Sequence, residues 1–179
     1  MAATKVTDPH DLLLYKLKVL LGTEREIEQM LPRLEREAHD DQLKEGFRRH
    51  LEETRRHVEN VEQAFKVLGV EPQATAAPAI KGLKTQHEGF AKAADEDVLP
   101  DVLDAVSAGS AAATEHHEIA EYEGAITLAE GLGLPGVAEV LQENLRDDEQ
   151  MLNGVKQVAQ RLSKKEEQEA QEIDLAETT

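Results

Sequence analysis

Four long segments of the chain repeat apolar residues at intervals of three and four, which is the spacing of one face of an α-helix. The predicted helices are residues 9–38, 42–68, 101–130 and 135–162. Aromatic residues make up only 3% of the chain and tryptophan is absent. A core must therefore be built from Leu, Val, Ile and Ala, which suits helices packed along their length better than a sheet sandwich. The sequence predicts an all-α fold.

Helix-capping and helix-breaking residues mark the ends of these segments. Asp8 followed by Pro9 is a strong helix start, because Asp can cap free backbone amides and Pro fits the first helical position. Pro32 is expected to bend the first helix without ending it, and Gly69 is expected to form a left-handed C-cap after the second. Short breaks then separate the helices of each pair, at residues 39–41 and 131–134. Each pair is predicted to form a helical hairpin.

A long connection separates the two hairpins. Residues 70–100 contain several Pro and Gly residues, and the stretch 79–94 is predicted to form one short extra helix. Two hairpins joined by a long crossover are typical of ferritin-like antiparallel four-helix bundles. We expect such a bundle over residues 8–162. The acidic C-terminal extension, residues 163–179, has few apolar anchors and is expected to be either an exposed helix or a disordered tail.

The composition excludes several classes of function. The formal net charge of −17 argues against nucleic-acid binding, which needs a patch of Lys and Arg. The chain has no cysteine, so disulfides, thiolate metal sites and Cys nucleophiles are excluded. The N-terminus lacks the basic and apolar regions of a signal peptide, and no apolar run is long enough to span a bilayer. We expect a cytoplasmic protein that binds neither nucleic acid nor membrane.

Ionisable residues interrupt the apolar face of every predicted helix, near the same level of the bundle. They are Glu24 and Glu28 in the first helix, His50, Glu53 and His57 in the second, Glu115 and Glu118 in the third, and Asp148 with Glu149 beside it in the fourth. Burying several unpaired carboxylates would unfold the bundle unless protons or cations neutralised them. Oxygen and imidazole ligands without sulfur suit iron, manganese or zinc. The pattern therefore predicts a site for two divalent metal ions, with iron or manganese favoured over zinc.

The predicted site departs from the usual two-metal pattern. Such bundles pair Glu and His three residues apart, whereas Glu53 and His57 are four apart, and the fourth helix has no histidine. Any one of these acids alone is more often a solvated surface residue, so the hypothesis depends on the coincidence of four helices. Tyr122, one turn after Glu118, could hydrogen-bond a ligand or lie next to a redox centre, although core packing with a satisfied hydroxyl is favoured.

Two strings of residues resemble the YciE/YciF-type ferritin-like family of bacterial stress-associated proteins. One is His50-Leu-Glu-Glu-Thr-Arg-Arg-His57-Val in the second helix, and the other is Glu115-His-His-Glu118-Ile-Ala-Glu-Tyr122 in the third. The resemblance implies a four-helix ferritin-like fold that forms a homodimer or larger homo-oligomer, a two-metal centre, and a role in stress responses. The ligands that it favours are Glu24, Glu53, His57, Glu115 and Glu118. In the fourth helix Asp148 and Glu149 lie where acids are expected, and Asn153 stands where a further acid is expected.

Two functional hypotheses follow. In the first, the protein holds two iron or manganese ions and oxidises ferrous iron or consumes peroxide. Glu53 or Glu118 then bridges the ions, and His57 adds a neutral nitrogen ligand. In the second, the protein is a non-catalytic module that dimerises or binds a partner, with a degraded or absent metal site and interior acids satisfied by hydrogen bonds, Arg side chains or water. The second ranks lower because no arginine falls on the buried register with the acids; the arginines considered are Arg48, Arg49, Arg55, Arg56 and Arg146. The pattern identifies ligands and leaves enzymatic turnover open.

Overall fold

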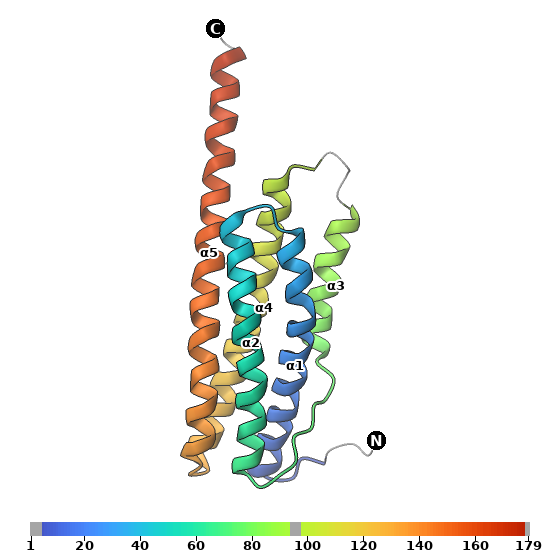
Figure 1. The fold of residues 1–179 in the computed structure, drawn as a ribbon, viewed down its shortest axis with the longest axis vertical. Coiled ribbons are helices and arrows are strands. Elements are labelled where there is room, and N and C mark those ends of the chain that lie inside the picture. The colour runs from blue at the N-terminus through green and yellow to red at the C-terminus, as the bar shows by residue number, and fades with distance from the viewer. Residues whose placement is uncertain (1–4, 94–97, 178–179) are drawn as a thin grey trace.

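The computed structural model describes residues 5–93 and 98–177, and every regular element in these ranges is an α-helix (Figure 1). The helices are α1 (Pro9–Glu37), α2 (Asp41–Val67), α3 (Pro78–Ala93), α4 (Pro100–Gly131) and α5 (Pro135–Glu177). α1 packs on α2 and α4, and α5 packs on the same two helices, so that α1, α2, α4 and α5 form an antiparallel four-helix bundle. α3 lies outside this bundle against α1 and α4. The predicted ferritin-like, all-α architecture is confirmed.

The helix boundaries lie within one residue of the predicted ones, with one exception. α5 was expected to end near Leu162, and it continues to Glu177, beyond the end of the other helices (Figure 1). Residues 155–177 contain neither Gly nor Pro, and they consist mainly of good helix formers, so nothing local stops the helix. Of the two alternatives for the C-terminal extension, the helix is the one found through Glu177. No helix in the described ranges is both long enough and apolar enough to cross a membrane.

Polar caps fix the ends of the first hairpin. Asp8 accepts a hydrogen bond from a first-turn backbone amide at 2.9 Å, and Gly69 has a φ of 69°, a left-handed conformation that glycine adopts without strain. A further tie was not predicted from the sequence. The buried carboxylate of Asp104 in α4 accepts hydrogen bonds from the backbone amides of His39 and Asp40, at 2.9 and 2.6 Å. The α1–α2 turn is thereby joined to the second hairpin.

The interior of the bundle has two apolar layers with a polar layer between them. One apolar layer includes Leu17, Leu21, Val61, Phe65, Ala125 and Leu141. The other includes Ile27, Leu31, Phe47, Ala108, Met151 and Val155. All four bundle helices contribute to both layers. The sequence of every bundle helix has a buried ionisable residue between the two apolar sets: Glu24, His57, Glu115, Glu118 and Asp148. His50 lies at the edge of the second set, so this polar layer occupies the middle of the bundle, whereas the buried Asp104 lies at the end near the α1–α2 turn.

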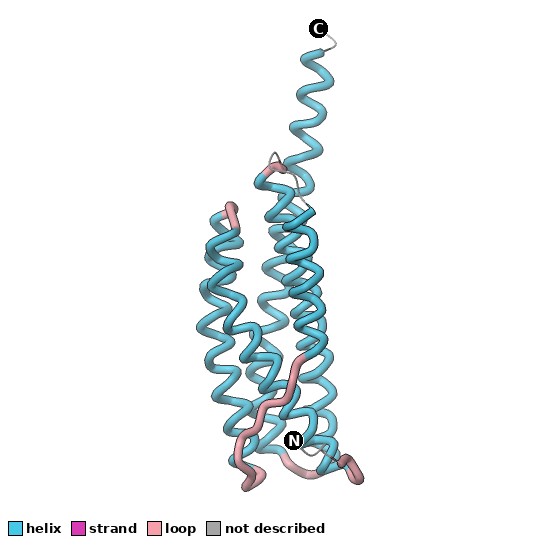
Figure 2. Tube along the Cα trace, turned by 90° about the vertical axis from the view of Figure 1, so that its right-hand side faces the viewer, coloured by secondary structure: helices cyan, strands magenta, loops and turns pink. Residues whose placement is uncertain are grey.

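The crossover between α2 and α3 runs along the side of the bundle (Figure 2) and touches α1 with its backbone. The Thr75 amide donates a hydrogen bond to the Lys18 carbonyl at 2.9 Å. Gly22 lies one turn further along α1, and a Cβ atom there would stand 2.0 Å from the Thr75 carbonyl oxygen. Only glycine therefore lets the crossover approach this closely.

Replacing Gly22 with alanine should destabilise the protein by roughly 1–3 kcal/mol, the usual cost of overpacking, even though alanine has the higher helix propensity. The matched control is Gly82→Ala in α3, where an added Cβ meets nothing within 4 Å. That variant should be more stable than wild type by up to about 1 kcal/mol. Urea unfolding followed by circular dichroism compares the two, and shifts of the same sign would show that the close contact at Gly22 does not constrain the fold.

Candidate metal centre

The polar layer brings carboxylates and imidazoles together from all four bundle helices. Its members are Glu24 from α1, His50 and His57 from α2, Glu115 and Glu118 from α4, and Asp148 from α5. Each of these side chains belongs to a residue that is at most 2% exposed. They are buried because each one occupies a position of the three-and-four stripe that faces the bundle axis. We call these six residues the buried cluster.

One half of the buried cluster surrounds His50. His50, Glu115, Glu118 and Asp148 each offer a ligand atom, and these four atoms lie within 4.8 Å of one another. The His50 Nε2 atom is 3.3 Å from Glu115 Oε1. Metal bonds to nitrogen and oxygen are about 2 Å long, so atoms this close together can be drawn onto one ion by small side-chain movements.

The other half of the buried cluster surrounds His57. The His57 Nδ1 atom lies 3.5 Å from Glu24 Oε2 and 3.6 Å from Asp148 Oδ1. The centroids of the His50 and His57 rings are 6.1 Å apart. Asp148 therefore takes part in both halves, as a carboxylate that bridges two ions must.

Each imidazole has a carboxylate on the side that faces away from the centre. His50 Nδ1 is 3.3 Å from Glu53 Oε2, and His57 Nε2 is 3.4 Å from Asp147 Oδ2. When each carboxylate accepts a hydrogen bond from the ring N–H of its neutral histidine, the other ring nitrogen keeps its lone pair. That nitrogen faces the buried cluster. Outer carboxylates that orient histidine ligands in this way are common in metalloproteins.

Tyr122 belongs to the apolar layer that contains Leu21 and Phe65, and it holds Glu24 in place by a hydrogen bond. Its hydroxyl donates a short hydrogen bond to Glu24 Oε1 and accepts one from Asn144 Nδ2 at 2.8 Å. Asn144 also donates to the His57 backbone carbonyl at 3.2 Å. The Tyr122 hydroxyl is thus satisfied within the core, and it fixes one oxygen of Glu24 while leaving the other free.

Many atoms of the buried cluster have no hydrogen-bond partner in the protein. These atoms are Glu24 Oε2, His50 Nε2, His57 Nδ1, Glu115 Oε2, both carboxylate oxygens of Glu118 and both of Asp148. The other such buried side-chain atom in the described residues is Thr23 Oγ1. Buried polar groups are normally hydrogen-bonded, whereas here every exception but Thr23 Oγ1 belongs to one cluster and is a carboxylate oxygen or an imidazole nitrogen, both of which bind metal. The donor set therefore fits a pair of divalent ions.

Burial and mutual repulsion shift the protonation of the buried cluster. Burial, reinforced by neighbouring acids, raises the pKa of Glu115 to about 8. The same two causes raise the pKa values of Glu118 and Asp148 well above the ordinary range. Burial alone would lower the pKa of His50 and of His57, but the nearby carboxylates outweigh it and raise both. Without metal, the buried cluster holds protons at neutral pH that divalent ions would displace.

The structure places most of the predicted ligands together, with differences in α1, α2 and α5. Glu28 was predicted on the inward face of the first helix, but it is partly exposed and pairs with Arg55 at 3.3 Å, because Ile27 takes the inward position of that turn. Glu24, His57, Glu115, Glu118 and Asp148 are all in the buried cluster. The Glu53 side chain is 13% exposed and lies at the edge of the buried cluster, next to the Nδ1 atom of His50. Glu149 is exposed, because neighbouring helical residues point about 100° apart and Asp148 takes the inward direction. Asn153 is also exposed, so the acid missing there does not leave a gap in the buried cluster.

Sequence reasoning missed two residues of the site. His50 was placed on the inward stripe but was not included among the predicted ligands. The signal was available, because His50 and His57 are seven residues apart and so lie on one face of the helix. Asp147, which orients His57, left no comparable signal, since a half-buried acid next to Asp148 resembles any surface acid.

Comparison with known proteins gives three consistent findings. Residues 8–168 match the family described as Domain of unknown function (DUF892). Protein YciF of Escherichia coli strain K12 is 31% identical over 143 residues, which cover 77% of this chain and 82% of that protein. Among solved structures, YcfI from Rhodopseudomonas palustris aligns with a TM-score of 0.82 at 33% identity, over 87% of this chain and 98% of that one.

Two further solved structures share the fold. The E. coli stress protein YciF aligns with a TM-score of 0.82 at 25% identity, over 89% of this chain and 99% of that chain. A protein from Xanthomonas campestris pv. campestris aligns with a TM-score of 0.69 at 21% identity, over 92% and 99% of the two chains.

Proposed function

The chain belongs to the DUF892 family of YciF-like ferritin-like proteins, and we propose that it binds two divalent ions of iron or manganese in the buried cluster. The observation that supports this proposal is the convergence of buried donor atoms that have no protein partner. Four carboxylates, from Glu24, Glu115, Glu118 and Asp148, carry four negative charges, which two divalent ions would balance if both histidines were neutral. Without such neutralisation, the carboxylates would repel one another in an apolar interior at a large cost in stability.

Each residue of the buried cluster has a role in this proposal. His50 and Glu115 would hold one ion, and His57 and Glu24 would hold the other. Glu118 and Asp148 would bridge the two ions. Bound iron would supply electron-transfer chemistry toward dioxygen or peroxide, which is the ferroxidase or peroxide-consuming activity that we propose. E. coli YciF is described as a stress protein, and such an activity would suit a similar role for this chain.

The alternative of a non-catalytic module requires internal cations or hydrogen bonds for the acids. The arginines near the buried cluster reach only the two carboxylates that lie behind its histidines, Asp147 and Glu53. Arg56 pairs with Asp147 at 3.1 Å and Arg49 with Glu53 at 3.5 Å, and both arginine side chains are half-exposed. The four inner carboxylates receive no such neutralisation, so we do not adopt this alternative.

Metal content tests the proposal directly. Protein incubated with manganous ion, or with ferrous ion under anaerobic conditions, and then desalted should retain about two ions per chain, because each half of the buried cluster supplies both nitrogen and oxygen ligands. Glu118→Gln should lose at least one of them, since an amide is a weak ligand for these ions. Elemental analysis by mass spectrometry gives the number.

The matched control for this measurement is Glu149→Gln, which makes the same chemical change on the exposed face of α5. It should keep the wild-type metal content. Folded wild-type protein that retains no metal would refute the proposal, and equal loss in both variants would show that the metal binds to surface acids.

A further inference from the structure

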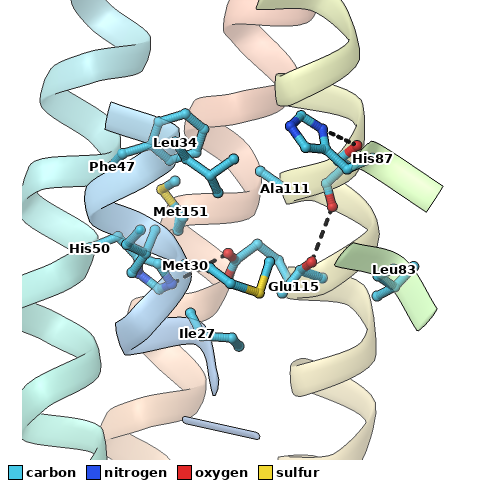
Figure 3. A pocket seen from close by; sticks show the side chains of 13 residues that line it. Ile27, Met30, Leu34, Phe47, His50, Leu83, His87, Ala111, Glu115 and Met151 are labelled. Carbon is cyan, nitrogen blue, oxygen red and sulfur yellow. Dashed lines mark hydrogen bonds and ion pairs between the residues drawn. The ribbon is translucent and has the colours of Figure 1, made fainter. Parts of the chain in front are cut away.

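An apolar pocket ends on the buried cluster. Its wall includes Met30, Leu34, Phe47, Leu83, Ala111 and Met151, and His50 and Glu115 lie at its inner end (Figure 3). Its volume of about 30 Å³ is enough for one or two molecules the size of water or dioxygen. Glu115 Oε2 and His50 Nε2, which face this end, are among the atoms without a protein partner.

A second pocket lies next to the first one, near the surface between α1 and α3. It has a volume of about 60 Å³ and shares three lining residues with the inner pocket: Met30, Leu34 and His87. Its outer residues include Arg33 and Glu88, which form a half-exposed ion pair at 3.0 Å. The three shared side chains lie between the two pockets, so small movements of these side chains would open a path from solvent to the buried cluster.

The chemistry of this path selects against ions. At the outer pocket Arg33 pairs with both Glu37 and Glu88, and Lys84 also lines the entrance. These charges nearly cancel, so the entrance has no excess of acids that would attract cations. A metal ion would also have to shed its water among Leu, Met and Phe side chains, which is costly. The main polar groups of the inner wall satisfy one another, because His87 Nδ1 lies 3.2 Å from Ser110 Oγ and Thr114 Oγ1 donates to the Ser110 carbonyl. An uncharged apolar molecule meets neither obstacle.

We propose that these two pockets are the route by which dioxygen reaches the metal pair. The proposal rests on the proposed function, since it assigns an oxidant to the same centre. It also gives α3 a role beyond connecting the hairpins, because Leu83 and His87 of α3 build the outer wall of the path. Hydrogen peroxide is less suited to this path, because its two O–H groups would lose their hydrogen bonds to water in the apolar section.

Xenon is the probe for the inner pocket, because it binds in dry apolar cavities and scatters anomalously. Crystals of the full chain under xenon pressure should show a xenon atom beside Ala111 and Met151. Ala111→Leu should fill the pocket and remove that peak, whereas Ala113→Leu, the same change on the exposed face of α4, should keep it. A wild-type crystal without xenon in this pocket overturns the route, whether or not the variants fold.

Oxidation kinetics test whether the path is used. Two ferrous ions give one electron each, two protons are taken up, and one dioxygen becomes one hydrogen peroxide. Ferrous oxidation in Ala111→Leu should be about tenfold slower, with the ferrous content unchanged and Ala113→Leu at the wild-type rate. Equal rates in both variants overturn the route.

The two proposals fail in different ways. Two bound ions with no xenon in the inner pocket would overturn the route and leave the metal centre intact. Xenon in the pocket of a protein that retains no metal would overturn the proposed function. The pockets would then lead to no metal pair, so the dioxygen route would be overturned with it.

Discussion

The metal-free protein should lose stability as the pH rises from about 5 to 8, and added metal should reverse the trend. The pKa of Glu115 is raised to about 8 in the folded protein, whereas an unfolded Glu titrates near 4.3. The folded state therefore binds this proton more tightly than the unfolded state does. The resulting gain in folding stability is complete at a pH below the pKa of the unfolded chain, and it is lost as the pH rises through the pKa of the folded protein. Each such carboxyl costs up to about 1.4 kcal/mol per pH unit over this range.

The other shifted groups of the buried cluster act in the same direction. Glu118 and Asp148 also have raised pKa values. The pKa values of His50 and His57 are raised as well, so the stability they contribute when charged is lost at the upper end of the range. The sum should be several kcal/mol between the two pH limits.

Metal ions should invert this dependence, because they bind deprotonated ligands and so bind more tightly at higher pH. An ion at a concentration 1,000 times its dissociation constant adds about 4 kcal/mol. In a chain of this length, that gain corresponds to a rise in Tm of roughly 10 °C. Calorimetry at pH 5 and pH 8, with chelator or with manganous ion, gives all four values.

The net charge of −17 also opposes folding at high pH through general repulsion. The informative quantity is therefore the difference between the metal-free and metal-loaded proteins at one pH and one salt concentration. This difference should grow from pH 5 to pH 8. A difference that stays constant or shrinks would show that the buried cluster does not exchange protons for metal.

The second large effect is that Glu118→Gln should stabilise the metal-free protein while it weakens metal binding. At pH 8 the wild-type side chain must either keep its proton against the solvent or face Asp148 as a second negative charge. Glutamine removes this cost. It introduces a smaller cost of about 1–3 kcal/mol, because its buried amide is incompletely hydrogen-bonded. The expected net gain is roughly 2 kcal/mol.

Urea unfolding at pH 8 with chelator should place Glu118→Gln above wild type, and the same titration with excess manganous ion should reverse their order. The exposed variant Glu149→Gln should follow wild type in both conditions. A metal-free Glu118→Gln protein that is less stable than wild type would indicate that the Glu118 carboxylate is satisfied within the protein, as the non-catalytic alternative requires.

Local patterns predicted the helices and most of the buried cluster. Glu24, Glu118 and Asp148 lie on stripes whose period depends only on helix geometry, so their burial could be read from the sequence alone. The early end assigned to α5 had a different cause: apolar residues become scarce after Leu162, but helix propensity continues without them.

Features that depend on contacts between helices could not be predicted. The stripe of α2 contains both His50 and Glu53, and only the packing against α4 places His50 at Glu115 and Glu53 behind it. The close contact of the crossover with Gly22, and the pocket that α3 closes, join segments that are far apart in the chain. Neither leaves a periodic signal.

The central claim is that acids and imidazoles from four helices hold two metal ions inside the bundle. Anomalous diffraction from crystals grown with manganous ion tests it most directly, because it locates each ion and its ligands. We expect two interior peaks that share Glu118 and Asp148, one beside His50 and the other beside His57. Peaks confined to surface carboxylates, with a hydrogen-bonded and metal-free interior, would contradict the account.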